Sequence, residues 1–189
     1  MQSDWLRELL KMSRKIAVLA AVLACSSCGQ SDKAGLPEQS EKVATSGKVQ
    51  TALDAVPKEV LAAAKAAQPH MTFTEAEAEV RDGRHYYDVA GTLPDGSEIE
   101  LDMLQEPAGW TVVETQRDIA LASAPEPVRA AIANADAAFK PGRVIESRQN
   151  DGITIYELFG PQRKGSEPRK VEVKYDGAEA EILTKEWAH

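Results

Sequence analysis

The residues of this 189-residue chain that could most readily carry chemistry are three histidines and two cysteines. A histidine activates a nucleophile only when a serine, cysteine or threonine lies within hydrogen-bond reach. His70, His85 and His189 are far apart, and none has a recognisable nucleophile motif beside it. Neither a His-x-x-x-His pair nor a glycine-rich phosphate loop occurs. We therefore predict that the chain is not an enzyme and has no catalytic, metal or cofactor site.

Both cysteines belong to a stretch typical of an export signal. Arg14 and Lys15 precede the apolar run 16–23, which is too short to span a bilayer. Residues 22–25, Val-Leu-Ala-Cys, resemble the lipobox of bacterial lipoproteins, in which the cysteine thiol accepts a diacylglyceryl group before cleavage. We predict lipidation at Cys25. Cys28 is the alternative site, although the apolar residue expected three positions upstream is missing there.

This motif divides the N-terminal part of the chain. Residues 1–24 are predicted to be a signal peptide, in which residues 1–11 are an extension upstream of a start at Met12, because acidic charge is unusual at the opening of such a signal. Residues 25–54 are predicted to be a lipid-anchored, flexible tether, since they contain few large apolar residues. An ordinary cleaved signal without a lipid is the other interpretation.

Beyond the tether the chain repeats one pattern. Pro57 and Pro125 each precede an alanine-rich segment with helical periodicity. Asp82-Gly83 and Asp151-Gly152 each separate two alternating segments, which predicts hairpins. Alternation also continues later in each half, at residues 98–103 and 170–175.

These elements predict an α+β fold made of two tandem repeats, residues 55–120 and residues 121–189. Each repeat is expected to be a helix packed on an antiparallel sheet of about four strands. The order of elements, with the strands Tyr87-Asp88-Val89 and Tyr156-Glu157-Leu158, resembles a tandem pair of the PepSY-like family. The secreted β-lactamase inhibitor proteins have a related doubled layout. The resemblance implies small, extracytoplasmic, non-catalytic modules that inhibit or sense a partner protein.

Charge is the feature of this region that points to a partner. Residues 56–118 contain 5 Lys or Arg against 13 Asp or Glu, whereas residues 125–189 contain 10 against 11. An acidic surface repels nucleic acid, so we predict no nucleic-acid binding. The candidate partner-binding face is the side of the sheet on which Tyr86, Glu98, Glu100 and Asp102 are expected to be exposed. A merely solvated sheet face is the alternative interpretation.

The predicted function is therefore that of a non-catalytic lipoprotein of the cell envelope. It faces the periplasm, and we favour the outer over the inner membrane. The N-terminal lipid holds it on the membrane, and the folded part binds a protein partner that carries a basic patch. The alternative is a structural or sensory lipoprotein that binds a small ligand or a cation.

Overall fold

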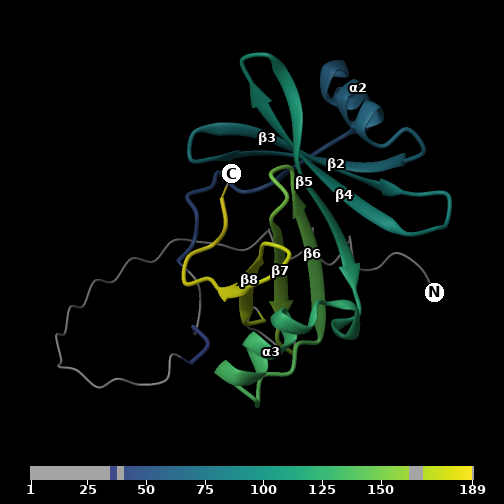
Figure 1. The fold of residues 1–189 in the computed structure, drawn as a ribbon. Coiled ribbons are helices and arrows are strands. Elements are labelled where there is room, and N and C mark those ends of the chain that lie inside the picture. The colour runs from purple at the N-terminus through teal and green to yellow at the C-terminus, as the bar shows by residue number, and fades with distance from the viewer. Residues whose placement is uncertain (1–34, 38–40, 162–167, 189) are drawn as a thin grey trace. The chain divides into compact units, whose positions relative to one another are not determined.

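The computed structural model describes residues 35–37, 41–161 and 168–188 of the chain. Over these residues the chain forms one antiparallel sheet in which nine strands are neighbours in chain order (Figure 1). All elements belong to one unit that begins at Leu36. The elements are β1 (Val49–Thr51), η1 (Leu53–Ala55), α2 (Lys58–Ala67), β2 (Thr72–Arg81), β3 (Arg84–Thr92), β4 (Glu98–Glu106), β5 (Gly109–Ile119), η2 (Leu121–Ser123), α3 (Glu126–Ala135), β6 (Arg143–Gln149), β7 (Thr154–Phe159), β8 (Lys170–Tyr175) and β9 (Ala180–Ile182).

The two α-helices lie where the sequence predicts them. Each begins directly after its proline, a position where the missing N–H leaves no helical hydrogen bond unmade. Apolar residues four apart then fall on one face of each helix. The buried residues on these faces are Val60 and Ala64 in α2, and Val128 and Ile132 in α3.

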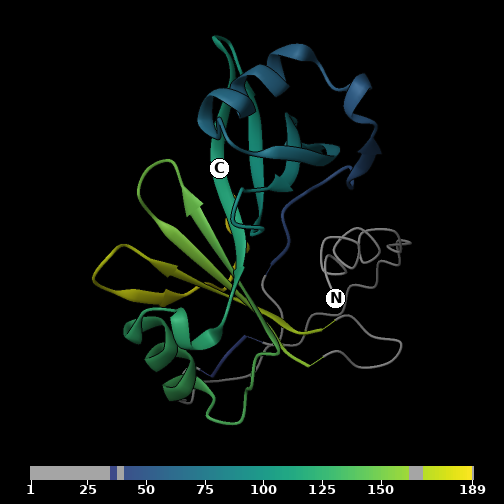
Figure 2. The same ribbon diagram turned by 90° about the vertical axis from the view of Figure 1, so that its right-hand side faces the viewer.

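Both helices cover the same face of the sheet. α2 packs on an apolar cluster that includes Val89 and Leu101, and α3 packs on a second cluster that includes Val144 and Leu158. The strand register carried through β4, β5 and β6 places Leu101 and Val144 on the same side. Figure 2 shows α2 beside the strands that precede β6, and α3 beside the later ones. The opposite side of the sheet carries polar side chains together with a small apolar cluster of Tyr86, Leu104 and Val113.

The prediction of two tandem helix-on-sheet repeats is wrong, because the strands form a single nine-stranded sheet. β5 joins the two predicted repeats, because it pairs with a strand of each. Its first part pairs with β4, and its last part, from Glu114 to Ile119, pairs with β6. A sheet that ended at β5 would expose a row of unpaired backbone groups, and pairing with β6 satisfies them. Local periodicity carries no signal for this pairing.

One turn follows directly from residue type. Asp82 and Gly83 join β2 to β3, with φ angles of 47° and 78°. Positive φ at both central residues is the conformation of a type I′ hairpin turn, and an Asp-Gly pair favours it. The turn sets the register in which Glu79 opposes Tyr86 and Glu77 opposes Asp88. It therefore determines which acidic side chains of β2 and β3 become neighbours.

Candidate functional site

The four residues of the predicted partner-binding face do not form an exposed surface. Tyr86, Glu100 and Asp102 have only 3%, 7% and 2% of their surface exposed, and Glu98 is half-buried. The register does place them on one side of the sheet, as the alternation predicts. The prediction that this side is exposed is wrong, because other parts of the chain cover it.

Across the middle of this side runs a row of four carboxylates, which we call the acid ladder. Glu77 of β2 opposes Asp88 of β3, Asp88 opposes Asp102 of β4, and Asp102 opposes Glu114 of β5. Glu77, Asp88, Asp102 and Glu114 all have less than a tenth of their surface exposed. Like charges directly opposite each other on neighbouring strands destabilise a sheet. Cations close by, or protons held on some of the carboxyl groups, relieve this repulsion.

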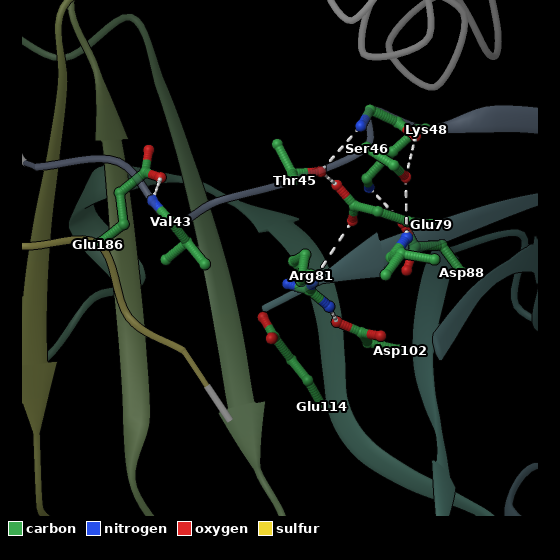
Figure 3. A network of polar contacts seen from close by, with 12 residues as sticks. Val43, Thr45, Ser46, Lys48, Glu79, Arg81, Asp88, Asp102, Glu114 and Glu186 are labelled. Atoms are coloured by element: carbon green, nitrogen blue, oxygen red, sulfur yellow. Dashed lines mark hydrogen bonds and ion pairs between the residues drawn. The ribbon is translucent and has the colours of Figure 1, made fainter. Parts of the chain in front are cut away.

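Two cations lie against the acid ladder (Figure 3). The Lys48 ammonium group forms an ion pair with Asp88 and lies 3.7 Å from Oε1 of Glu100. The Arg81 guanidinium donates to Oδ2 of Asp102 and lies 3.3 Å from Oε2 of Glu79. It also covers the ring of Tyr86, at 4.1 Å from the ring centroid. Tyr86 is therefore buried between the Arg81 guanidinium and an apolar cluster that it forms with Leu104 and Val113.

Lys48 reaches the acid ladder from a segment that precedes the sheet. Residues 41–48, which we call the strap, contact the C-terminal residues 183–187, which we call the tail, and further along the chain the edge of β2. Backbone hydrogen bonds join Ser46 N to Val80 O at 2.9 Å, Asp82 N to Ala44 O at 3.0 Å and Glu41 N to Thr184 O at 2.9 Å.

The prediction of a flexible tether over residues 25–54 is wrong for the strap, which is attached to the sheet. Its residues form backbone bridges with Arg81 and with the tail, and β1 and η1 follow immediately. Leu36, further towards the N-terminus, is buried in the cluster beneath α3. The predicted signal peptide and the lipidation sites Cys25 and Cys28 lie outside the described residues.

Burial changes the proton affinity of the carboxylates around the acid ladder. It raises the pKa of Glu100 to about 7, against the opposing effect of Lys48. It also raises the pKa of Asp102 and of Glu77, and the neighbouring carboxylate of Asp88 adds to both shifts. For Lys48, burial acts to lower the pKa, but Asp88 and Glu100 outweigh it and raise the pKa. These carboxyl groups therefore hold protons more tightly than exposed ones do, and a cation close by favours their ionised form.

A second group of carboxylates lies further along the same face. Nζ of Lys170 lies 2.7 Å from Glu172, 3.1 Å from Glu186 and 3.9 Å from Glu157. Glu172 also accepts a hydrogen bond from the backbone N–H of Trp187, at 2.7 Å. Burial raises the pKa of Glu157, although Lys170 opposes the shift. The tail is thus held on the sheet by the same kind of contact as the strap.

Between strap and tail lies a hollow of about 100 Å³ that is lined by Val43, Glu114, Glu157 and Trp187, among others. Ser147 lies on this face, in register between Gln116 and Ile155, which both line the hollow. The Ser147 side chain is 1% exposed, and its hydroxyl oxygen makes no hydrogen bond to any described residue. The hollow is therefore lined by acidic groups and by the cations Arg81 and Lys170, and the Ser147 hydroxyl beside it is unsatisfied.

The described residues offer no arrangement typical of a metal centre: within residues 35–37, 41–161 and 168–188, no three His, Cys, Asp or Glu side chains could hold a metal ion. His70 and His85 are exposed, and His189 lies outside the described part. What the face can do chemically is to bind cationic side chains and hydrogen-bond to extended backbone.

Sequence reasoning identified the acidic strands but missed the cations that lie on them. Lys48 lies in a polar segment whose composition is typical of a linker. Arg81 is the last residue of β2, directly before a hairpin turn, where a charged residue is usually exposed. The one local signal is Gly47, whose φ of 79° redirects the chain just before Lys48. Nothing in the local sequence shows that Lys48 meets β3 and β4.

No family model matches this chain, and no curated protein matches it. The resemblance to the PepSY-like family therefore stays a prediction. In the part of the chain that the structure describes, none of the helices has the length and apolar character needed to cross a membrane.

Proposed function

We propose that this protein is a non-catalytic lipoprotein of the cell envelope that binds a protein partner, and that the sheet face with the acid ladder receives an extended, basic segment of that partner. The observation that carries the proposal is the ladder itself. Four carboxylates lie directly opposite one another on neighbouring strands, where each disfavours the charge of the next. Such an arrangement weakens the fold and favours the binding of cations.

The form of the partner segment follows from what the face already holds. Strap and tail are both extended, and backbone hydrogen bonds and charged side chains attach them. An extended peptide that brings lysine or arginine side chains makes the same two kinds of contact. Recognition of extended segments at sheets commonly combines backbone hydrogen bonds with side-chain contacts in this way.

The N-terminal sequence is the basis for proposing that the protein is located in the cell envelope. Arg14, Lys15, the apolar run 16–23 and Cys25 have the order of an export signal that ends in a lipid anchor. We propose that the lipid holds the protein on the periplasmic side of a membrane, the outer rather than the inner one. Intact mass of the exported protein tests this, because a diacylglyceryl group on the Cys25 thiol adds the mass of the lipid and the cleavage that follows removes residues 1–24.

Binding can be measured with the mature full chain in detergent and a defined probe. The probe is a synthetic dodecapeptide in which lysine and threonine alternate, with a glutamate-threonine peptide as its counterpart. The test variant is Glu77→Gln with Glu157→Gln, which removes two charges from the face. The matched control is Glu59→Gln with Glu126→Gln, which removes two charges from exposed positions of α2 and α3.

We expect the lysine peptide to bind the wild type and the control equally, and the test variant about tenfold more weakly. The glutamate peptide should bind none of them. Equal affinity of the lysine peptide for test variant and control would show that the sheet face with the acid ladder does not bind the peptide. Crosslinking in intact cells then identifies the natural partner.

The alternative, a protein that binds a small ligand or a cation, has less support. The hollow of about 100 Å³ and a second one of about 260 Å³, lined by Ser46, Tyr86 and Trp110 among others, are both smaller than the roughly 300–1,000 Å³ typical of small-molecule sites. Calorimetry of the mature chain with calcium alone separates the two functions, because the partner-binding proposal predicts no saturable heat.

A further inference from the structure

The strap occupies the place on the acid ladder that the proposed function assigns to a partner. Lys48 of the strap reaches the ladder, where it forms an ion pair with Asp88. Asp88 is the second member of the ladder and is 4% exposed. We propose that the strap is an internal competitor for the partner: the basic segment binds by displacing Lys48 and residues 41–47 from the face. This inference rests on the proposed function and adds its regulation.

The local conformation of the strap directs Lys48 onto the carboxylates. Gly47 has a φ of 79°, which an L side chain rarely adopts. Its N–H donates to Oγ1 of Thr45 at 3.0 Å, and the Thr45 hydroxyl in turn donates to Glu79. Thr45 and Gly47 thus hold a turn whose next residue is Lys48. Loss of the Thr45 hydroxyl should loosen the strap without changing any charge on the ladder.

The remaining attachments of the strap can exchange with water. None of residues 41–48 is buried, and Val43, Gly47 and Lys48 are half-buried while the others are exposed. The strap is joined to its neighbours by backbone hydrogen bonds to Val80, Asp82 and the tail, and by a bond from Val43 N to Oε2 of Glu186 at 3.2 Å. Leu36, by contrast, belongs to an apolar cluster. Release of the strap therefore withdraws no buried side chain of residues 41–48.

Departure of Lys48 alone would leave Asp88 and Glu100 without their cation. Both side chains are largely buried, so the open state needs a replacement charge. A partner with several basic residues supplies Lys48's contacts and can also neutralise Glu77. Strap release and partner binding are consequently coupled. The apparent affinity equals the intrinsic affinity multiplied by the fraction of molecules whose strap is released.

Two variants of the mature full chain test the competition with the lysine-threonine peptide. Thr45→Val removes the hydroxyl that holds the turn, and Lys48→Met removes the competing cation. Thr51→Val is the matched control, because the Thr51 hydroxyl donates only locally, to Val49 O at 3.2 Å. We expect Thr45→Val and Lys48→Met each to bind the peptide about tenfold more tightly than wild type, and Thr51→Val to bind as wild type does. Thr45→Val leaves the ladder's charges intact and so keeps the test valid if Lys48→Met does not fold.

Hydrogen exchange on the wild-type chain supplies the second readout. The amides of Glu41, Val43, Ser46 and Asp82 are protected only through strap contacts. Displacement predicts that saturating peptide accelerates their exchange at least about tenfold. If the peptide binds while these amides keep their protection and Thr45→Val has wild-type affinity, the strap is not a competitor, although the proposed function stands. If the peptide binds none of the proteins, the proposed function itself fails and the inference with it.

Discussion

The ammonium nitrogen of Lys48 lies 3.7 Å from Oε1 of Glu100. This contact joins a residue of the predicted tether to a residue of the predicted partner-binding face. Both residues were expected to be in water, and each instead helps to bury the other. The contact also explains why the acidic face can exist in a folded chain, since Lys48 offsets part of the repulsion among its carboxylates.

The stability of the fold should fall as pH rises from about 4.5 to about 7. Burial raises the pKa of Glu100 from its ordinary 4.5 to about 7, so the folded chain holds this proton more tightly than the unfolded chain does. The protonated Glu100 stabilises the fold fully at a pH below its pKa in the unfolded chain. This stabilisation is lost as the pH rises through its pKa in the folded chain. The loss is on the order of 2–3 kcal/mol for one such group. Asp102 and Glu77, whose pKa values are also raised, act in the same direction.

Urea unfolding of the wild type and of Glu100→Gln across this pH range measures the effect. The variant has no proton to lose at this position, so its stability should vary less with pH. A wild-type unfolding free energy that stays constant or increases across the range would contradict the assignment.

Neutralising one member of the acid ladder should stabilise the protein. Glu77→Gln removes a like-charge neighbour of Asp88, and we expect the unfolding free energy at about pH 8 to rise by about 0.5–1 kcal/mol. Glu172→Gln is the comparison on the same face. Because Glu172 accepts from Lys170 and from the Trp187 N–H, each at 2.7 Å, its neutralisation should lower stability by about 1–2 kcal/mol. If both substitutions raise the unfolding free energy, or both lower it, then Glu77 and Glu172 do not differ in their effect on stability as we expect.

Arg169 should anchor the segment that leads to the strap. Its guanidinium donates to Leu36 O and Pro37 O, both at 2.9 Å, and lies 5.2 Å from the ring centroid of Phe139. We expect Arg169→Ala to lower the unfolding free energy by about 1–3 kcal/mol and to expose residues 36–37 to proteases. Arg129→Ala is the matched control, since Arg129 bonds only to the nearby Ala124 O. Unchanged proteolysis in Arg169→Ala would contradict this role.

Gly91 marks a place where the sheet has no room for a side chain. A Cβ atom there would lie 2.3 Å from Thr72 O and 2.8 Å from the Met71 side chain. The Thr72 oxygen is part of the backbone of β2 and cannot move aside alone, so Gly91→Ala should lower stability by about 1–3 kcal/mol. Gly142→Ala meets nothing within 4 Å and provides the control. Thermal unfolding of both variants checks this, and similar midpoints would show that the strands separate easily.

Much of the local structure could be predicted because its causes lie within a few residues. Pro57 and Pro125 predict where the helices begin, and Asp82-Gly83 predicts a hairpin turn that the φ angles confirm. The alternation at residues 98–103 predicts that Glu98, Glu100 and Asp102 share one side of β4, as the register shows. These features follow from backbone conformation and from a strand's period of two.

The architecture and the exposure of the candidate site could not be predicted in the same way. Whether β5 ends a repeat or pairs with β6 depends on residues 143–149, which lie beyond the intervening helix α3. Whether Glu100 contacts water or Lys48 depends on the path of the strap, a segment whose residues have no strong preference for helix or strand. Both outcomes depend on contacts between distant parts of the chain, and such contacts produce no periodic pattern in the sequence.

By itself, then, the sequence determined the helices, the turn, the side of the sheet that carries the acids and the motif that ends in Cys25. Only the tertiary structure decided that the strands join into one sheet and that the acidic side is covered by the strap and the tail. The physical reason is that hydrogen-bonding preferences and periodicity act locally, whereas strand pairing and the burial of charge are settled by which distant groups satisfy one another.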